Sequence, residues 1–192
     1  MLQTFKRSTK TGMLAFGTVA LLTGLPSGFV AAETFGFGTT PTAEEIAAVD
    51  IDAMPDGRGL PAGSGSVADG EAVYAEQCAA CHGDNLEGVS DAGGAALIGG
   101  RGTIGTPETK KTVESYWPYA PTLFDYVKRA MPFNAPGSLS DDDIYAVSAY
   151  ILHRADIIGA DAVMDADTLA AVEMPNEDGF IHDPRPDIYN YR

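Results

Sequence analysis

The sequence predicts an all-α domain flanked by two acidic arms. Two observations support this fold class: apolar residues recur at helical spacing in three segments, and glycine- or proline-rich stretches separate these segments. The three segments are residues 66–81, 121–129 and 140–155. We therefore expect one helical domain over residues 66–156, an extended N-terminal arm over 33–65 and an extended C-terminal arm over 157–192.

Suitable capping residues stand at the start of each predicted helix. Ser66 can cap the first, Pro121 suits the first turn of the second, and Ser140 can cap the third. Gly70 is unfavourable inside the first helix, so we expect another helix to cross closely there, with Tyr150 of the last helix as a neighbour. The alternative is that Gly70 only frays the helix start. In the arms, short helices are expected near residues 42–49 and 166–172.

The end of the first helix carries the sequence Cys78-Ala79-Ala80-Cys81-His82, a C-x-x-C-H motif. Its two thiols are spaced to form thioethers with one porphyrin, and the next residue, His82, can ligate the iron. Because the chain has only two cysteines, the motif predicts one covalently attached haem c.

Other readings of the motif fit the sequence less well. A disulfide between Cys78 and Cys81 would close a short, strained loop, and a redox-active C-x-x-C usually lies in a βαβ unit, which is missing here. A zinc site would need two more ligands, but His153 and His182 are isolated in the sequence.

The glycine-rich stretch 83–105 and the aromatic stretch 116–119 follow the motif. Glycine lets backbone approach a haem edge closely, and Leu97 and Ile98 are expected to pack on the porphyrin. Arg101 is a candidate partner for a haem propionate, although it could equally be a solvated loop residue. Trp117 is a second candidate, through its indole N–H, and plain core packing is the alternative.

A methionine is the usual second axial ligand of electron-transfer haems. Outside the N-terminal leader, the chain has Met54, Met131, Met164 and Met174. Of these, only Met131 lies between two predicted helices of the central domain, so we expect it to be the distal ligand. His153 is the main rival, but its place inside the last helix makes the iron harder to reach.

The first 32 residues have the features of a secretory signal peptide. Lys6, Arg7 and Lys10 precede an apolar run over residues 12–25, and small residues end at Ala32. The apolar run is shorter than the ~20 residues of a spanning helix. We therefore expect cleavage near Ala32, no membrane span afterwards and a periplasmic protein.

The charge of the chain is strongly acidic. The formal net charge is −15, and removing the three bases of residues 1–32 would take it to −18. Such a chain is a poor nucleic-acid ligand because it has no basic stripe to replace counterions. Within this acidic chain, the central segment carries four cations: Lys110, Lys111, Lys128 and Arg129. We expect them to help dock an acidic partner, and the alternative is that they are merely solvated.

The order of helix, C-x-x-C-H, glycine-rich loop, aromatic segment, Met-Pro and helix resembles class I cytochrome c over residues 66–156. The resemblance implies that the first and last helices cross, with Gly70, Tyr74 and Tyr150 at the contact, and that His82 and Met131 are the axial ligands. In this family a proline carbonyl after the haem motif often holds the proximal imidazole. Here the matching stretch, residues 93–97, has no proline, so the sequence names no partner.

A narrower resemblance includes the arms. It rests on residues 50–52 (DID), 55–57 (PDG), 59–61 (GLP), 111–120 (KTVESYWPYA), 123–133 (LFDYVKRAMPF), 174–176 (MPN) and 183–187 (DPRPD). These are similar to the cytochrome c subunit of sulfane dehydrogenase in the Sox sulfur-oxidation system and to related sulfite dehydrogenase cytochromes. Some members of that group carry two haem domains, whereas this chain has one C-x-x-C-H.

The resemblance implies an electron-transfer subunit that is not catalytic alone. It would accept electrons from a subunit with a molybdenum cofactor and pass them to another c-type cytochrome. Two alternatives stay open from the sequence: a free mono-haem shuttle for a different dehydrogenase or oxidase, and a haem-based ligand binder or peroxidase with an open distal position.

Overall fold

The computed structural model describes residues 38–181, and the predicted signal peptide and the end of the C-terminal arm lie outside them. Residues 1–40 and residues 41–192 form two separate units, and all the described helices and strands belong to the second. Its elements are α1 (Ala43–Val49), β1 (Gly65–Ser66), α2 (Val67–Gln77), α3 (Ala79–His82), η1 (Ser90–Ala92), α4 (Pro121–Ala130), α5 (Asp141–Arg154), β2 (Val163–Met164), α6 (Ala166–Ala170) and η2 (Glu177–Gly179). Among the described residues, no helix has the length and apolar character needed to cross a membrane.

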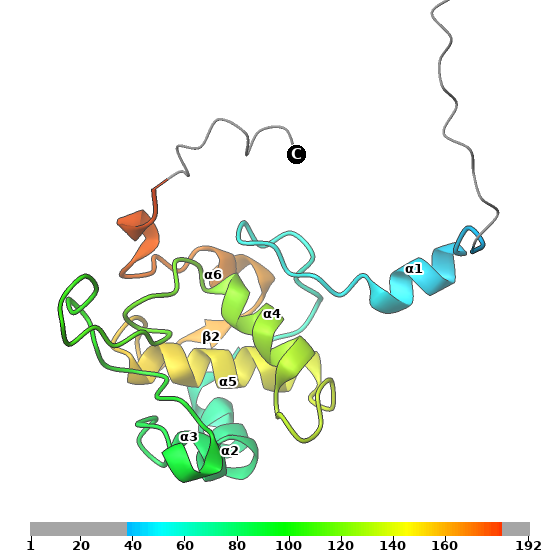
Figure 1. The fold of residues 1–192 in the computed structure, drawn as a ribbon. Coiled ribbons are helices and arrows are strands. Elements are labelled where there is room, and N and C mark those ends of the chain that lie inside the picture. The colour runs from blue at the N-terminus through cyan, green and yellow to red at the C-terminus, as the bar shows by residue number, and fades with distance from the viewer. Residues whose placement is uncertain (1–37, 182–192) are drawn as a thin grey trace, which may run out of the picture. The chain divides into compact units, whose positions relative to one another are not determined.

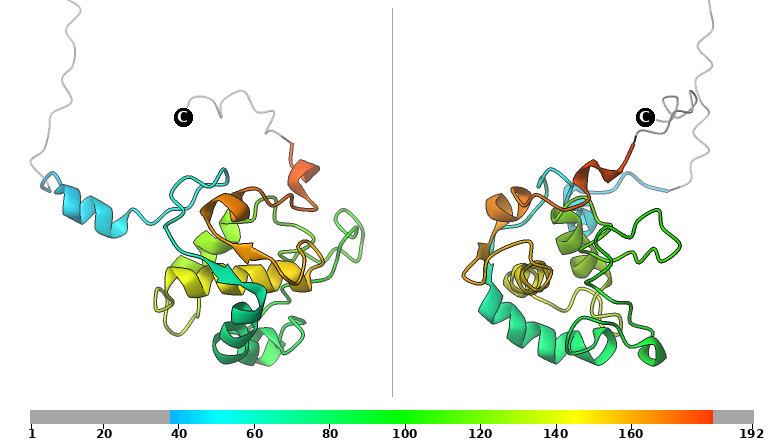
Figure 2. Two further views of the ribbon diagram at one scale, coloured as in Figure 1. Left: turned by 180° about the vertical axis from the view of Figure 1, so that it is seen from behind. Right: turned by 90° about the vertical axis from the view of Figure 1, so that its left-hand side faces the viewer.

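Helix α5 is the centre of the fold. Residues 144–152 of this helix are all buried, which is the expected pattern for a helix surrounded by other elements rather than lying on the surface. Figure 2, in which α5 is seen end-on in the right-hand view, shows α2, α4 and the C-terminal arm around it. The rings of Phe124 on α4 and Tyr145 on α5 pack with their centroids 4.5 Å apart.

Helices α2 and α5 cross closely, as the position of Gly70 predicts. A Cβ atom on Gly70 would overlap the carbonyl oxygen of Ala146 and would lie 2.9 Å from the Cβ of Tyr150. Beside this contact, the rings of Tyr74 and Tyr150 have centroids 5.2 Å apart. Gly70 is therefore required by packing, and the alternative of a frayed helix start is wrong.

The helix starts follow the predicted caps, with one difference at the end of the first helix. The Ser66 hydroxyl accepts a hydrogen bond from the backbone N–H of Asp69, and Ser140 and Asp143 form a capping box. The first helix does not run unbroken to Cys81. Cys78 has φ −123° and ends α2, and the chain restarts as the single turn α3. The C-x-x-C-H motif thus has a turn of its own.

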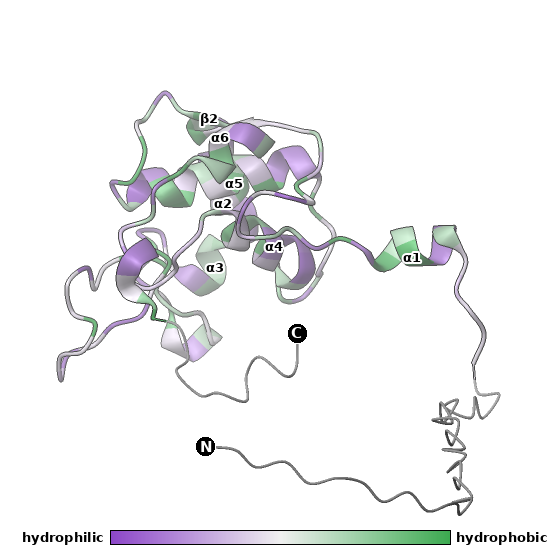
Figure 3. Ribbon diagram, turned by 90° about the horizontal axis from the view of Figure 1, so that it is seen from above, coloured by the Kyte–Doolittle hydropathy of each residue, from purple (hydrophilic) through white to green (hydrophobic). Residues whose placement is uncertain are grey.

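The N-terminal arm is held against α4 and α5 by hydrogen bonds. The backbone N–H of Ala53 donates to Asp125 on α4 (2.9 Å), and the hydroxyl of Tyr145 on α5 donates to the carbonyl of Pro61 (2.8 Å). Ala53 is only 7% exposed. The short helix α1 lies before this attachment and has no buried residue. Figure 3 shows both hydrophobic and hydrophilic residues on it.

The C-terminal arm also contributes to the core. Its strand β2 pairs antiparallel with β1, so that Gly65 faces Met164. Leu169 of α6 is fully buried, and Met174 is 4% exposed. In Figure 1 the arm returns along α5 toward α4. Both arms are therefore largely irregular in backbone structure, but they pack on the helical domain within the described residues.

Candidate haem site

The three residues of the C-x-x-C-H motif are brought together by the turn α3. Cys78 ends α2 and is half-buried, Cys81 is exposed, and His82 is partly exposed at the end of α3. The backbone N–H of His82 donates to the carbonyl of Cys78 (2.9 Å). One helical turn thus presents both thiols and the imidazole, the donor set that covalent attachment of one haem requires.

The orientation of the His82 ring is fixed by a backbone carbonyl. Its Nδ1 lies 2.7 Å from the carbonyl oxygen of Ala95. A carbonyl only accepts hydrogen bonds, so Nδ1 carries the proton and Nε2 keeps its lone pair for a metal. This contact supplies the imidazole partner that the sequence did not name, and it comes from the stretch 93–97.

The loop after the motif is folded tightly back onto it. The backbone N–H of Gly88 donates to the carbonyl of His82 (2.7 Å), and that of Val89 donates to Cys81 (2.9 Å). A Cβ atom on Gly94 would overlap the carbonyl of Cys81. A side chain at position 94 would therefore push the loop off α3 and move Ala95 away from the imidazole.

Burial affects two ionisable groups beside the motif. It raises the pKa of the free Cys78 thiol to about 11, and the neighbouring Cys81 adds to this effect. It also raises the pKa of Tyr74 well above its ordinary value. The Tyr74 hydroxyl therefore stays protonated and donates to the carbonyl of Gly83 (2.7 Å), which ties α2 to the loop directly after His82.

Met131 stands at the C-terminal end of α4. Its backbone N–H donates to Val127 (3.0 Å), and the following Met131–Pro132 peptide bond is cis. Its side chain is partly buried against the core. By contrast, Met164 and Met174 are 5% and 4% exposed within the core formed by the C-terminal arm. Because Met164 and Met174 are buried in the core, Met131 is better placed than either of them to act as an iron ligand at the surface of the core.

The rival ligand His153 is engaged elsewhere. Its Nδ1 lies 3.3 Å from the carbonyl oxygen of Ile158, just beyond the end of α5. The choice of Met131 over His153 remains a prediction.

Arg101 is held by two contacts within the chain. Its Nε donates to the carboxylate of Glu114 (3.0 Å), and its Nη2 donates to the carbonyl of Ala155 at the end of α5. Glu114 also accepts the backbone N–H of Gly99. Arg101 therefore joins the glycine-rich loop to the last helix. Its remaining Nη1 could still bind a propionate, and that role stays a prediction.

Trp117 lies in an aromatic segment that contacts the C-terminal arm. The indole ring is partly buried and meets the ring of Tyr126 edge-on, with centroids 5.7 Å apart. The Asn176 side chain donates to the carbonyl of the preceding Tyr116 (2.8 Å). The centroid of the Tyr116 ring lies 5.3 Å from that of Phe180 and 4.7 Å from the Lys111 ammonium nitrogen. The propionate role of Trp117 likewise stays a prediction.

The residues around the motif fit a haem. Several apolar side chains pack on the core but remain partly exposed: Val73, Cys78, Ala79, Leu97, Ile98, Trp117 and Met131. Among them are Leu97 and Ile98, which the sequence predicts to pack on the porphyrin. A flat apolar ring attached to α3 would cover such side chains, and burying them stabilises the folded chain. The free Nε2 of His82 and the two free thiols complete the donor set.

Two of the cations that were expected to dock a partner are paired within the chain. The Lys128 ammonium lies 2.6 Å from Asp141, and the Arg129 guanidinium binds both Asp52 and Asp125. Arg129 thereby fastens the N-terminal arm to α4. An intramolecular role for Lys128 and Arg129 weakens the argument that they are docking residues.

The all-α fold and this donor set define a c-type cytochrome. The cytochrome c family model matches residues 67–155. A chain of the crystal structure described as the sulfane dehydrogenase SoxCD from Paracoccus pantotrophus is 42% identical, with a TM-score of 0.73, over 80% of this chain and 75% of that one. The chain belongs to the cytochrome c family and has the class I fold, which implies covalently bound haem c.

Two curated relatives are thiosulfate dehydrogenases. The protein from Stutzerimonas stutzeri (strain A1501) is 31% identical over 58% of this chain and 33% of its own length. The protein from Allochromatium vinosum (strain ATCC 17899) is 28% identical over 77% of this chain and 50% of its own length. The chain thus spans a third to a half of these relatives.

Three contributors to the site were missed from the sequence, because none has a local signal. Ala95 acts through its backbone carbonyl, which every residue has. Glu114 and Asn176 act across 13 and 60 residues of sequence, respectively. Glu114 is one of two acids between residues 101 and 114, and the other, Glu108, is nearer to Arg101 in the sequence.

Proposed function

We propose that this chain is the electron-transfer subunit of a sulfane or sulfite dehydrogenase complex. In this role it accepts electrons from a subunit with a molybdenum cofactor and passes them to another c-type cytochrome. The proposal includes export to the periplasm after cleavage near Ala32 and a single haem at Cys78 and Cys81.

One observation carries the proposal: the similarity to the SoxCD chain extends into the arms. That match covers 80% of the chain, whereas the haem domain of residues 67–155 is less than half of it. A likeness limited to the haem domain would fit any carrier of this fold. Arms that are packed on the domain and shared with a subunit of a complex favour the same kind of assembly.

Different residues of the chain attach the haem and ligate its iron. Cys78 and Cys81 hold the haem, and His82 and Met131 are its proposed axial ligands. A bound haem c supplies one-electron oxidation and reduction. The hydrogen bond from His82 to Ala95 keeps the imidazole oriented in both redox states. If His82 and Met131 both hold the iron of a bound haem, no coordination site would remain for the substrate, and the sulfur chemistry would belong to the partner.

The test is a gentle purification of the native protein from the periplasmic fraction. Molybdenum is assayed in the purified sample, and the visible spectrum is recorded before and after addition of sulfite, or of thiosulfate with a sulfur-carrier protein. We expect molybdenum to co-purify and the haem to be reduced. A molybdenum-free protein that no sulfur compound reduces would contradict the proposal and would support a free mono-haem shuttle.

A second candidate function has support from the curated relatives. Both are thiosulfate dehydrogenases, although this chain spans only part of each. In the same experiment, reduction of the isolated, molybdenum-free protein by thiosulfate alone would favour that activity over the role of a carrier subunit.

A further inference from the structure

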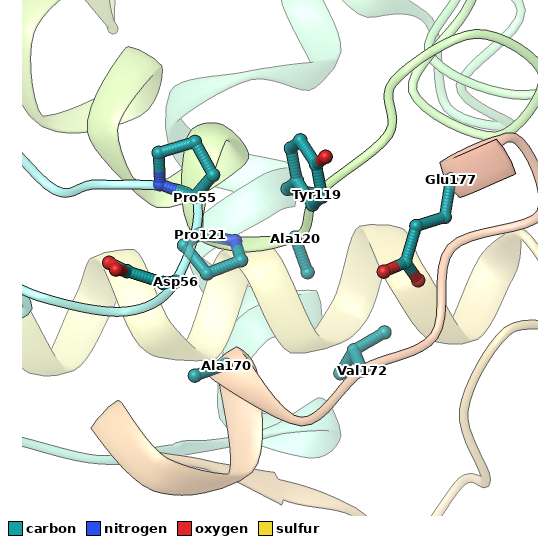
Figure 4. Close-up of a pocket in the computed structure, with 8 residues that line it drawn as sticks. All are labelled: Pro55, Asp56, Tyr119, Ala120, Pro121, Ala170, Val172 and Glu177. Carbon is teal, nitrogen blue, oxygen red and sulfur yellow. The ribbon is translucent and has the colours of Figure 1, made fainter. Parts of the chain in front are cut away.

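A pocket of about 340 Å³ lies where the two arms meet the start of α4. Its walls come from Pro55 and Asp56 in the N-terminal arm, from residues 119–121 before and in α4, and from Ala170, Val172 and Glu177 in the C-terminal arm (Figure 4). None of Cys78, Cys81, His82 and Met131 lines it. The pocket is therefore a feature of the arms and not part of the haem site.

The pocket combines an apolar floor with one available carboxylate. Ala120 and Pro121 are buried, and Val172 is half-buried. In Figure 4 the Glu177 side chain extends toward Val172 and Ala120, whereas the Asp56 carboxylate points to the opposite edge. Asp56 is already paired with Arg58 at 2.7 Å, and this contact holds the pKa of Asp56 below its usual value. Among the residues that the structure describes, no cation forms an ion pair with Glu177.

The backbone around Glu177 is anchored on both sides. Its own N–H donates to the carbonyl of Met174 (3.1 Å), a residue of the core. The neighbouring Asn176 donates to Tyr116 (2.8 Å), next to the segment that supplies Tyr119. The carboxylate is thus presented from a fixed segment, which lowers the ordering cost of binding.

We infer that this pocket receives an arginine side chain from a partner protein. The methylene stem of arginine suits an apolar floor, and its planar guanidinium suits a carboxylate. The Tyr119 ring, 37% exposed, lies beside the pocket and can stack on the cation. The acidity of the chain, with a formal net charge of −15, favours a partner whose docking surface is basic.

This inference deepens the proposed function, on which it rests only for the identity of the partner. The dehydrogenase subunit would insert the arginine into the arms, at a surface distinct from the haem-attachment turn. Packing of the arms on the domain would then serve binding, because the pocket for the arginine forms between the two arms.

The test is a titration of the ¹⁵N-labelled holoprotein with Nα-acetyl-arginine methylamide, followed by NMR. We expect saturable shifts at the amides of the pocket residues and binding weaker by roughly fivefold for the uncharged citrulline analogue, as an exposed ion pair worth about 1 kcal/mol gives. Glu177→Gln should remove this preference for arginine. The control Glu173→Gln removes an exposed acid of the same arm that does not line the pocket, and it should bind like the wild type.

The titration does not involve the dehydrogenase, so its result is separable from that of the purification. Equal shifts with arginine and citrulline, or an unchanged preference in Glu177→Gln, would overturn the inference even if molybdenum co-purifies. Selective arginine binding would uphold the pocket even if no molybdenum subunit associates, and in that case the proposed function alone would fail.

Discussion

The haem-attachment segment has hydrogen bonds between residues near one another in sequence, whereas the arms are held by hydrogen bonds between residues far apart in sequence. Tyr74 reaches Gly83 over 9 residues, and His82 reaches Ala95 over 13. In the arms, the hydrogen bond between Ala53 and Asp125 spans 72 residues. The bond between Tyr145 and Pro61 spans 84. The first region is specified locally, and the second depends on the finished core.

This difference separates the roles of the two regions. A local turn can present thiols and an imidazole for haem attachment with few demands on the rest of the chain. The arms need α4 and α5 in place before Asp125 and Tyr145 can bind them. We therefore expect substitutions at the central crossing to affect both regions, and substitutions in the arms to leave the haem spectrum unchanged.

The largest effect is expected at the crossing that both regions share. Gly70→Val would place a side chain against the Ala146 carbonyl and Tyr150, and the helices would have to separate. We expect a loss of about 3 kcal/mol or more in the free energy of unfolding, measured by denaturant unfolding of the holoprotein. The control Gly159→Ala adds a Cβ where nothing lies within 4 Å. Similar stabilities for both variants would contradict the packing role of Gly70.

The second largest loss of stability is expected for a substitution in the C-terminal arm, and it tests whether this arm belongs to the core. Leu169 is fully buried, so Leu169→Ala should leave a cavity and cost about 2–3 kcal/mol. Ile181, 91% exposed in the same arm, should tolerate Ile181→Ala within about 0.5 kcal/mol. Thermal unfolding of the two variants provides the measurement. A Leu169→Ala variant as stable as Ile181→Ala would show that the arm does not pack as described.

A smaller effect is expected where the N-terminal arm is attached. Asp125→Ala would leave the buried N–H of Ala53 and one side of Arg129 without a partner, at a cost of about 1–2 kcal/mol. Hydrogen exchange at the Ala53 amide should accelerate while exchange in α2 stays unchanged. Asp52→Ala removes only the more exposed partner of Arg129 and should change stability by less than about 0.5 kcal/mol. Equal exchange rates in both variants would argue against the attachment.

The smallest effect is a pH dependence in the C-terminal arm. Hydrogen bonds from the backbone N–H and the side chain of Thr168 lower the pKa of Asp165, the cap of α6, below its ordinary value. A carboxylate whose folded-state pKa is lowered stabilises the fold fully above its unfolded-state pKa, and the stabilisation is lost as the pH falls through the folded-state value. Asp165→Asn keeps a capping side chain but cannot titrate. The wild type should therefore lose stability relative to this variant below about pH 4, and parallel curves would contradict the role of Asp165.

The local region could be predicted from the sequence in most respects, because its signals are local. The motif at residues 78–82, the caps Ser66 and Ser140, and the close approach at Gly70 each depend on residue types with a known conformational or chemical preference. The break at Cys78 was missed, because an unbroken helical pattern gives no sign that one residue will leave the helix.

The arms could be predicted less well, because their partners lie far away in sequence. The short helices α1 and α6 were expected from composition. The contacts that pack the arms were not: Asp125 with Ala53, Asn176 with Tyr116, and the pairing of β1 with β2. Neither Asp125 nor Asn176 differs in sequence from a solvated polar residue, and a two-residue strand has too little pattern to detect. For the same reason, the expectation that Lys128 and Arg129 help dock a partner did not foresee their pairing with Asp141 and Asp52.

The most direct test of the account is the near-infrared spectrum of the oxidised holoprotein, in which methionine ligation of ferric haem gives a weak charge-transfer band. We expect the band in the wild type and in Met54→Leu, and its loss together with a lower reduction potential in Met131→Ala. A wild type without the band, or a Met131→Ala variant that keeps it, would contradict ligation by His82 and Met131 and with it the assignment of this chain as an electron carrier with both axial positions filled.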